Sequence, residues 1–251
     1  MSQAIFNHRS IRKFKSDPIP NDSLYYILEA ASRASTTGNM QVYSIIVTKD
    51  SETKFNLWEA HFKQEMVKQA PVILTFCADF NRFVKWCEQR KAKPGYDNFL
   101  SFTTGAIDAL LAAQNAALAA EEKDLGICYL GTTTYMADEI VKILKLPRLV
   151  VPVTTLVVGI PDENPGLTDR LPQQGIVHEE TYKDFTKQDI DEIYFERETS
   201  AFTKELLKIN KKETLAQIFT DLRYTLKDNQ LFSEKYLELI KKQGFMNNGN
   251  K

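Results

Sequence analysis

A short segment near the amino terminus carries side chains that can hold an anion. It reads His8-Arg9-Ser10-Ile11-Arg12-Lys13-Phe14. In an extended backbone alternate residues share one side, which would align the imidazole of His8, the hydroxyl of Ser10 and the guanidinium of Arg12. A guanidinium presents a fork of donors that matches phosphate oxygens, and a hydroxyl adds one more. The pattern is compatible with a phosphate-binding site. Considered alone, however, the segment is better interpreted as a solvated basic stretch.

Several common catalytic motifs are absent from the sequence. It contains no Gly-x-Gly pair, no Gly-Lys-Ser/Thr, no Gly-x-Ser-x-Gly and no His-Glu-x-x-His. These absences disfavour the dinucleotide fingerprint, the phosphate-binding loop, serine hydrolases and zinc peptidases. The three histidines, His8, His61 and His178, are too scattered to predict a metal cluster, and we expect no metal site.

Charge and hydropathy set further limits on function. Across 251 residues, 32 Lys and Arg stand against 33 Asp and Glu, so no nucleic-acid partner is expected. The most apolar stretch, residues 98–120, contains Asp108 and owes much of its apolarity to alanine, which favours a buried helix over a membrane span. Residues 1–9 lack the pattern of a secretory signal, so we expect a cytoplasmic protein. The cysteines are expected to be reduced packing residues: Cys77, Cys87 and Cys128.

Short apolar runs alternate with helical patterns along the first 160 residues. The predicted strands are 42–48, 71–78, 125–131 and 149–160, and the predicted helices include 21–33, 81–93 and 98–120. This alternation indicates layers of helices and sheet, and it leaves open whether the strands run parallel or antiparallel. After Gly175 there is no proline, and no glycine occurs before Gly244. The remaining tail is therefore expected to be helical, docked on its own domain or on a second subunit.

The order and spacing of several separated segments match one known family. The segments are His8 to Phe14, Ala34 to Gln41 leading into Ser44-Ile45-Ile46, Phe76 to Arg82, Asp108 to Ala120, Tyr129-Leu130-Gly131, Leu144 to Pro147, Gly159 with Pro161, and Asn164-Pro165 through Arg170-Leu171-Pro172. No single segment identifies a family, but the occurrence of all of them in this order and at this spacing is specific. Over nearly its whole length the chain resembles the nitroreductase superfamily, in particular its branch of NADPH:FMN oxidoreductases.

The resemblance implies a fold and an assembly. The fold would be of the α+β class, with a mostly antiparallel sheet wrapped by helices. The assembly would be an obligate homodimer with one FMN in each of two interface clefts. Residues 1–175 would form the FMN-binding core, and residues 176–251 a helical C-terminal extension on the core or the partner subunit, within a single domain overall.

The resemblance also implies a chemistry. FMN would carry it while the protein supplies binding, orientation and electrostatics, so no catalytic side chain is expected. NADPH or NADH would deliver hydride and leave, and a nitroaromatic, a quinone or free flavin would then accept the electrons at the same open site, in a ping-pong cycle. The alternative is a flavin-binding storage or sensor protein with little turnover.

Position by position, the resemblance implies three groups of FMN-binding residues and one group for the reductant. The phosphate and ribityl end would be held by His8, Arg9, Ser10, Arg12 and Arg170, with Thr168 standing where many relatives have a lysine. The ribityl and ring edge would be reached by the polar loop, through Thr36, Thr37, Gly38, Asn39 and Gln41. The ring would meet Gln64 at its pyrimidine edge and the loop formed by Tyr129, Leu130, Gly131 and Thr132. Candidates for the nicotinamide nucleotide phosphates are Lys208, Lys211, Lys212 and Arg223.

Overall fold

The computed structural model describes residues 4–248 and divides them into two units. The first unit contains residues 4–166 and 232–248, and the second is Leu167–Leu231. Residues 1–3 and 249–251 lie outside the described part. The first three residues of the 1–9 segment and the last three of the expected helical tail are therefore not described. The expected division of the chain at residue 175 stays a prediction.

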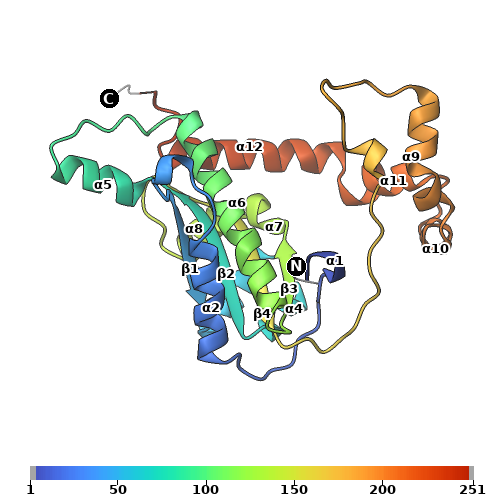
Figure 1. Ribbon diagram of the computed structural model, residues 1–251, viewed down its shortest axis with the longest axis horizontal. Helices are drawn as coiled ribbons and strands as arrows, with labels where there is room; N and C mark the ends of the chain where they lie inside the picture. Colours follow the sequence, from blue (N-terminus) through green and yellow to red (C-terminus); the bar gives the residue numbers. More distant parts are fainter. Residues whose placement is uncertain (1–3, 249–251) are drawn as a thin grey trace. The chain divides into compact units, whose positions relative to one another are not determined.

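A four-stranded sheet forms the centre of the first unit (Figure 1). The strands are β1 (Tyr43–Thr48), β2 (Val72–Asp79), β3 (Gly126–Leu130) and β4 (Val150–Gly159). They lie in the order β1-β2-β4-β3, and every neighbouring pair is antiparallel. The register of β2 against β4 shifts between Phe76 and Cys77, next to Pro152, a residue without an N–H for the ladder. The predicted strands and the mostly antiparallel sheet are confirmed.

Two helices cover one face of the sheet, α2 (Asn21–Ser32) and α6 (Phe99–Glu121) (Figure 1). The core on this face joins Ile27 of α2 and several alanines of α6 to Phe76 and Leu156 of the sheet. Small side chains let the long helix approach closely. A Cβ added to Gly105 would lie 3.0 Å from the Ala78 Cβ, which is tighter than ordinary packing. The predicted helix is present, but only its alanine-rich face is buried against the sheet. Among the described residues no helix is apolar over a length that would cross a membrane.

Helices on the opposite face pack around a second core. They are α3 (Ser51–Ala60), α4 (Glu65–Gln69), α7 (Thr132–Tyr135) and α8 (Ala137–Ile143). Leu57, Val67 and Ile140 from these helices meet Ile73 and Val157 of the sheet. The short helix α1 (Ala4–Asn7) precedes the anion-binding segment, and the turn η1 (Thr37–Asn39) lies in the polar loop.

One predicted helix is shorter than its sequence pattern indicated. The helix α5 (Asn81–Gln89) was expected to reach residue 93. It ends early because Lys91 takes the left-handed conformation, with φ of 61°. The N–H of Ala92 then bonds to the Cys87 carbonyl at 2.9 Å, which closes the helix end before the Pro94-Gly95 pair.

The second unit is irregular over residues 167–186, apart from one short turn, and mainly helical from Lys187 onward. It contains η2 (Gln173–Gly175), α9 (Lys187–Thr199), α10 (Ala201–Asn210), α11 (Leu215–Ile218), the π-helical turn η3 (Phe219–Arg223) and the start of α12 (Leu226–Lys242). Reciprocal capping boxes begin α9 and α11. From Phe232 onward the chain belongs to the first unit, where Leu239 and Phe245 pack with Phe80 in a third core cluster. Helices occupy most of residues 187–242, whereas residues 176–186, which were expected to belong to the helical extension, form no helix.

Candidate functional site

The amino-terminal segment runs beside strand β3. Ser10 forms an isolated parallel bridge with Ile127, and the N–H of Ile11 bonds to the Ile127 carbonyl at 2.9 Å. Ile11 is buried, whereas Arg12 is exposed. The segment is therefore extended at residues 10–12, which is the condition under which Ser10 and Arg12 share one side, and its buried Ile11 side chain anchors it to the sheet.

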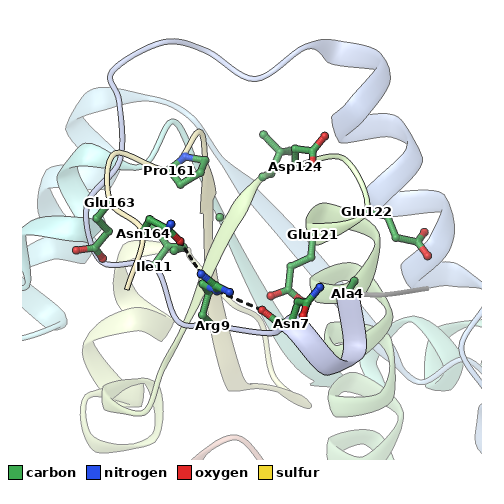
Figure 2. Close-up of a pocket in the computed structure, with 12 residues that line it drawn as sticks. Ala4, Asn7, Arg9, Ile11, Glu121, Glu122, Asp124, Pro161, Glu163 and Asn164 are labelled. Atoms are coloured by element: carbon green, nitrogen blue, oxygen red, sulfur yellow. Dashed lines mark hydrogen bonds between the residues drawn. The ribbon is translucent and has the colours of Figure 1, made fainter. Parts of the chain in front are cut away.

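Arg9 and Arg12 have different surroundings. The Arg9 guanidinium donates to Asn164 Oδ1 at 2.5 Å and to the Pro165 carbonyl at 3.1 Å. Arg9 lines a cavity of about 720 Å³. Figure 2 shows its side chain extending towards Asn164. The cavity is also lined by Glu121, Glu122, Asp124 and Glu163. Four carboxylates around one guanidinium disfavour a phosphate there, because like charges repel.

Arg12 keeps its guanidinium free of such partners. Its backbone N–H donates to Glu163 Oε1 at 2.5 Å, but across residues 4–248 its side chain makes no hydrogen bond or ion pair. The chain folds Ser10 and Arg12 towards Cys128. Burial raises the pKa of the Cys128 thiol, and the Arg12 charge and a hydrogen bond with Ser10 only partly offset this effect. A hydroxyl and an unpaired guanidinium thus lie together beside β3.

His8 does not extend this row. It directly follows α1, and its Nδ1 lies 2.7 Å from Glu121 Oε1. Glu121 lines the cavity that also contains Arg9. Of the three side chains predicted to align, the structure brings Ser10 and Arg12 together and directs His8 to a carboxylate.

The polar loop takes an unusual backbone conformation. Gly38, Asn39 and Gln41 have φ of 57°, 56° and 53°, in the left-handed region. Asn adopts this region more readily than most residues, and Gly adopts it freely. The Gln41 side chain donates to Asn39 Oδ1 at 3.0 Å. The loop at Thr36, Thr37, Gly38, Asn39 and Gln41 is therefore compact.

Two residues that sequence reasoning did not assign to the site hold this loop. The carboxylate of Asp108, which is fully buried in α6, accepts the N–H of Thr37 at 2.9 Å and that of Val42 at 3.3 Å. The Arg82 guanidinium donates to the Gln41 carbonyl. An acidic residue in the middle of an alanine-rich helix was a usable signal for Asp108, because a buried carboxylate requires donors.

A second cluster joins Gln64 to the loop after β3. Gln64 Nε2 donates to Thr132 Oγ1 at 3.3 Å and to the His61 carbonyl at 3.1 Å. His61 Nδ1 lies 2.8 Å from the same Thr132 hydroxyl. Burial lowers the pKa of His61 to about 4, which keeps its imidazole neutral at pH 7. Sequence reasoning proposed Gln64 and Thr132 for one site and missed His61, which it treated only as a scattered histidine.

The end of β3 and the following Gly131 border open space. Leu130 is buried, and the half-buried Tyr129 donates to Gln114 Oε1 at 3.4 Å. Gly131 is exposed, and a Cβ added to it would have no atom within 4 Å. A flat ligand can therefore approach the backbone at Gly131 closely.

Two other groups of candidate residues belong to the second unit. Arg170 donates to Thr168 Oγ1 at 2.6 Å and to the Asp169 carbonyl at 2.9 Å. Lys212 pairs with Asp221 at 2.8 Å, and the Arg223 guanidinium lies 5.7 Å from the centre of the Phe219 ring. In the described part of the chain, Lys208 and Lys211 have no ion pair and are exposed.

The chain matches one protein-family model and several known proteins. The model, described as the nitroreductase family, matches residues 5–160. A Bacillus subtilis protein named FMN reductase (NAD(P)H) is 32% identical over 245 residues, which cover 97% of this chain and 96% of that protein. The oxygen-insensitive NADPH nitroreductase of Salmonella typhimurium is 33% identical, with 97% of each chain covered.

A solved structure from Bacteroides fragilis is similar throughout. Its TM-score is 0.95 at 52% sequence identity, and the match covers 97% of this chain and 99% of that one. Both the sequence and the antiparallel sheet with its covering helices therefore agree with one assignment. The chain belongs to the nitroreductase family.

Proposed function

We propose that the protein is an FMN-dependent oxidoreductase that passes reducing equivalents from NADPH or NADH to a small-molecule acceptor. The relatives named above as an FMN reductase and an NADPH nitroreductase support this function, since each match covers almost the whole chain. When bound, FMN supplies the redox chemistry, accepting hydride from the nicotinamide and delivering electrons to the acceptor. The protein's own residues bind and orient the reactants.

The observation that carries the proposal is the hydrogen bond from Gln64 to Thr132. The resemblance assigns both residues to the flavin ring, yet they lie in different segments of the chain. Their direct contact supports a single site at the beginnings of α4 and α7, next to the open backbone of Gly131.

The donor set also fits a monophosphate. Ser10 offers a hydroxyl and Arg12 an unpaired guanidinium, both on the segment beside β3. A guanidinium without an internal carboxylate partner retains its donors for a ligand. We assign these two residues to the FMN phosphate.

We also propose a homodimer. Helix α6 exposes a stripe of large apolar side chains, with Leu100 75%, Ile107 49% and Leu111 43% exposed. Positions 100, 107 and 111 share one face of a helix, and contiguous apolar surface of this kind is typical of an interface. A second copy of the chain is the partner that the family resemblance implies.

The acceptor and the compartment are proposed from the same chemistry. An open backbone at Gly131 favours a flat acceptor, such as a nitroaromatic, a quinone or free flavin. All three cysteines are buried and unpaired, which agrees with a reducing compartment, and we propose the cytoplasm.

Titration of the apoprotein with FMN tests the proposal, with flavin fluorescence as the readout. One FMN should bind per chain, and FAD should bind more weakly because the Ser10 and Arg12 pair is suited to a terminal phosphate. A steady-state panel of nitroaromatics, quinones and free flavin then identifies the acceptor class. Protein that binds no flavin at all would contradict the function.

A further inference from the structure

A buried histidine adjoins the candidate flavin site with half of its hydrogen-bonding capacity unused. The His61 side chain is fully buried at the end of α3. Its Nδ1 lies 2.8 Å from Thr132 Oγ1, whereas its Nε2 is buried and, among residues 4–248, has no hydrogen-bond partner. An unpaired buried polar atom costs free energy, so a histidine here requires a compensating role.

The backbone after His61 is strained in a way that keeps Gln64 close. Phe62 and Lys63 both have φ of 56°, in the left-handed region that residues with large side chains rarely adopt. This tight turn brings the His61 carbonyl within 3.1 Å of Gln64 Nε2. Consecutive strained residues persist only where surrounding contacts determine the conformation, and such residues cluster at functional sites.

The contacts of Gln64 fix which way its carboxamide faces. A backbone carbonyl only accepts hydrogen bonds, so the group 3.1 Å from the His61 oxygen must be the amide nitrogen. The same nitrogen donates to Thr132. Within the described chain Gln64 Oε1 has no hydrogen-bond partner, so it remains available to accept a hydrogen bond from a ligand.

Proton placement decides what Thr132 offers. With the imidazole proton on Nε2, a buried N–H would be left without an acceptor, and orphaned donors of this kind are rarer than orphaned acceptors. The proton therefore belongs on Nδ1, which donates to Thr132 Oγ1. Since Gln64 also donates to that oxygen, the hydroxyl proton of Thr132 remains free to donate elsewhere.

We propose that His61 is a positioning residue of the flavin site, acting through Thr132. By donating to the Thr132 oxygen it turns the Thr132 hydroxyl proton outward beside Gln64 Oε1, so that the chain presents one donor next to one acceptor. The pyrimidine edge of FMN alternates carbonyl oxygens with an N–H, which is the complementary pattern. This inference rests on the proposed flavin function.

Two substitutions of His61 separate positioning from packing. In His61→Asn the amide occupies the place of Nδ1 and can still donate to Thr132, although the smaller side chain leaves a larger cavity. In His61→Gln the amide extends towards the place of Nε2, and the bond to Thr132 is lost while most of the volume is kept. Positioning predicts tighter FMN binding for Asn than for Gln, whereas packing predicts higher stability for Gln.

The experiment measures FMN dissociation constants by fluorescence titration of the apoproteins, together with their thermal unfolding without FMN. His61→Gln should weaken FMN binding about five- to tenfold, the loss typical of one hydrogen bond, and His61→Asn less than about threefold. His61→Asn should nevertheless unfold at the lower temperature, since it leaves the larger cavity.

Substitutions at Thr132 keep the test decisive if a His61 variant does not fold. Thr132→Val should weaken FMN binding at least as much as His61→Gln, and the double variant should add little to the loss, because both changes remove the same interaction. Thr134→Val is the matched control, since within the described chain the Thr134 hydroxyl makes one hydrogen bond, to the Gly131 carbonyl at 3.4 Å. It should bind FMN like the unaltered chain.

Three results would overturn the inference while the flavin function stands. The first is that His61→Gln and Thr132→Val bind FMN as tightly as the unaltered chain. The second is that His61→Gln, the more stable variant, binds FMN more tightly than His61→Asn. The third is that Thr134→Val loses as much FMN affinity as Thr132→Val. Failure of the unaltered chain to bind FMN would instead overturn the proposed function, and this inference with it.

Discussion

Gln64 donates through Nε2 to the hydroxyl of Thr132 at 3.3 Å, which joins two side chains 68 residues apart in the sequence. Gln64 is the N-cap residue of α4, and Thr132 is the first residue of α7. Their contact makes a single site from two segments that the sequence identifies separately.

Replacement of Arg12 should weaken FMN binding far more than replacement of Arg9. Among residues 4–248 the Arg12 guanidinium has no hydrogen-bond or ion-pair partner, whereas that of Arg9 is bonded to Asn164 and Pro165. A charge-assisted hydrogen bond contributes about 1.5 to 3 kcal/mol, so Arg12→Ala should cost roughly one to two decades of affinity. Arg9→Ala is the matched control. It should lower the unfolding temperature, and it should weaken FMN binding far less than Arg12→Ala. Equal losses of affinity would mean that both guanidinium groups contact the phosphate.

Asp108→Asn should destabilise the chain and loosen the polar loop. Asp108 accepts two backbone N–H groups, and an amide would direct a donor at one of them. The cost is about 1 to 3 kcal/mol of unfolding free energy, measured by urea denaturation. Asp138→Asn is a suitable control, because the side-chain interaction that Asp138 makes in the described part of the chain is an exposed 3.9 Å ion pair with Lys142. If Asp108→Asn unfolds like the control and binds FMN normally, the loop does not depend on this carboxylate.

His61 should make stability depend on pH between about 4 and 7. Burial lowers the pKa of His61 to about 4 in the folded chain, from 6.5. In that interval the unfolded chain binds a proton that the folded chain excludes, so the unfolding free energy falls as the pH falls. From pH 7 to pH 5 this contribution is about 2 kcal/mol, and His61→Gln should lack it. The same pH dependence in both proteins, measured by urea denaturation without FMN, would mean that His61 titrates normally.

The preference for NADPH over NADH should be modest. Lys212 is paired with Asp221, and Arg223 lies against Phe219, so Lys208 and Lys211 are the candidates left without such partners in the described chain. Lysine attracts a phosphate but lacks the planar fork of arginine. The ratio of kcat/KM values should favour NADPH by no more than about thirtyfold, within the range that flexible charge contacts provide. A preference of several hundredfold for either nucleotide would require a different phosphate site.

Local sequence patterns predicted most elements of the first unit, because its strands are apolar runs bounded by polar or turn residues. Residues 71–78 predicted β2 within one residue at each end. Strand direction did not follow from these runs, since a fully buried strand has no period that distinguishes parallel from antiparallel pairing. It came from the family resemblance instead. The predicted end of α5 was wrong because the helix is closed by Lys91, a residue type that does not favour φ above zero.

The site was predicted in part. The alignment of Ser10 with Arg12 assumed an extended backbone, which the structure has there. The direction of His8 towards Glu121 depends on a residue 113 positions away. The roles of Asp108 and His61 also arise from contacts between distant segments. Composition and periodicity describe neighbours along the chain, so they can mark a residue such as Asp108 as unusual but cannot say which distant groups it contacts.

Anaerobic mixing of the FMN-loaded protein with NADPH, followed by flavin absorbance, tests the proposed activity most directly. An oxidoreductase should lose its flavin absorption rapidly, and a quinone or nitroaromatic added afterwards should restore it. Flavin absorption that persists with both NADPH and NADH would contradict the activity and indicate a protein that binds FMN without turning it over.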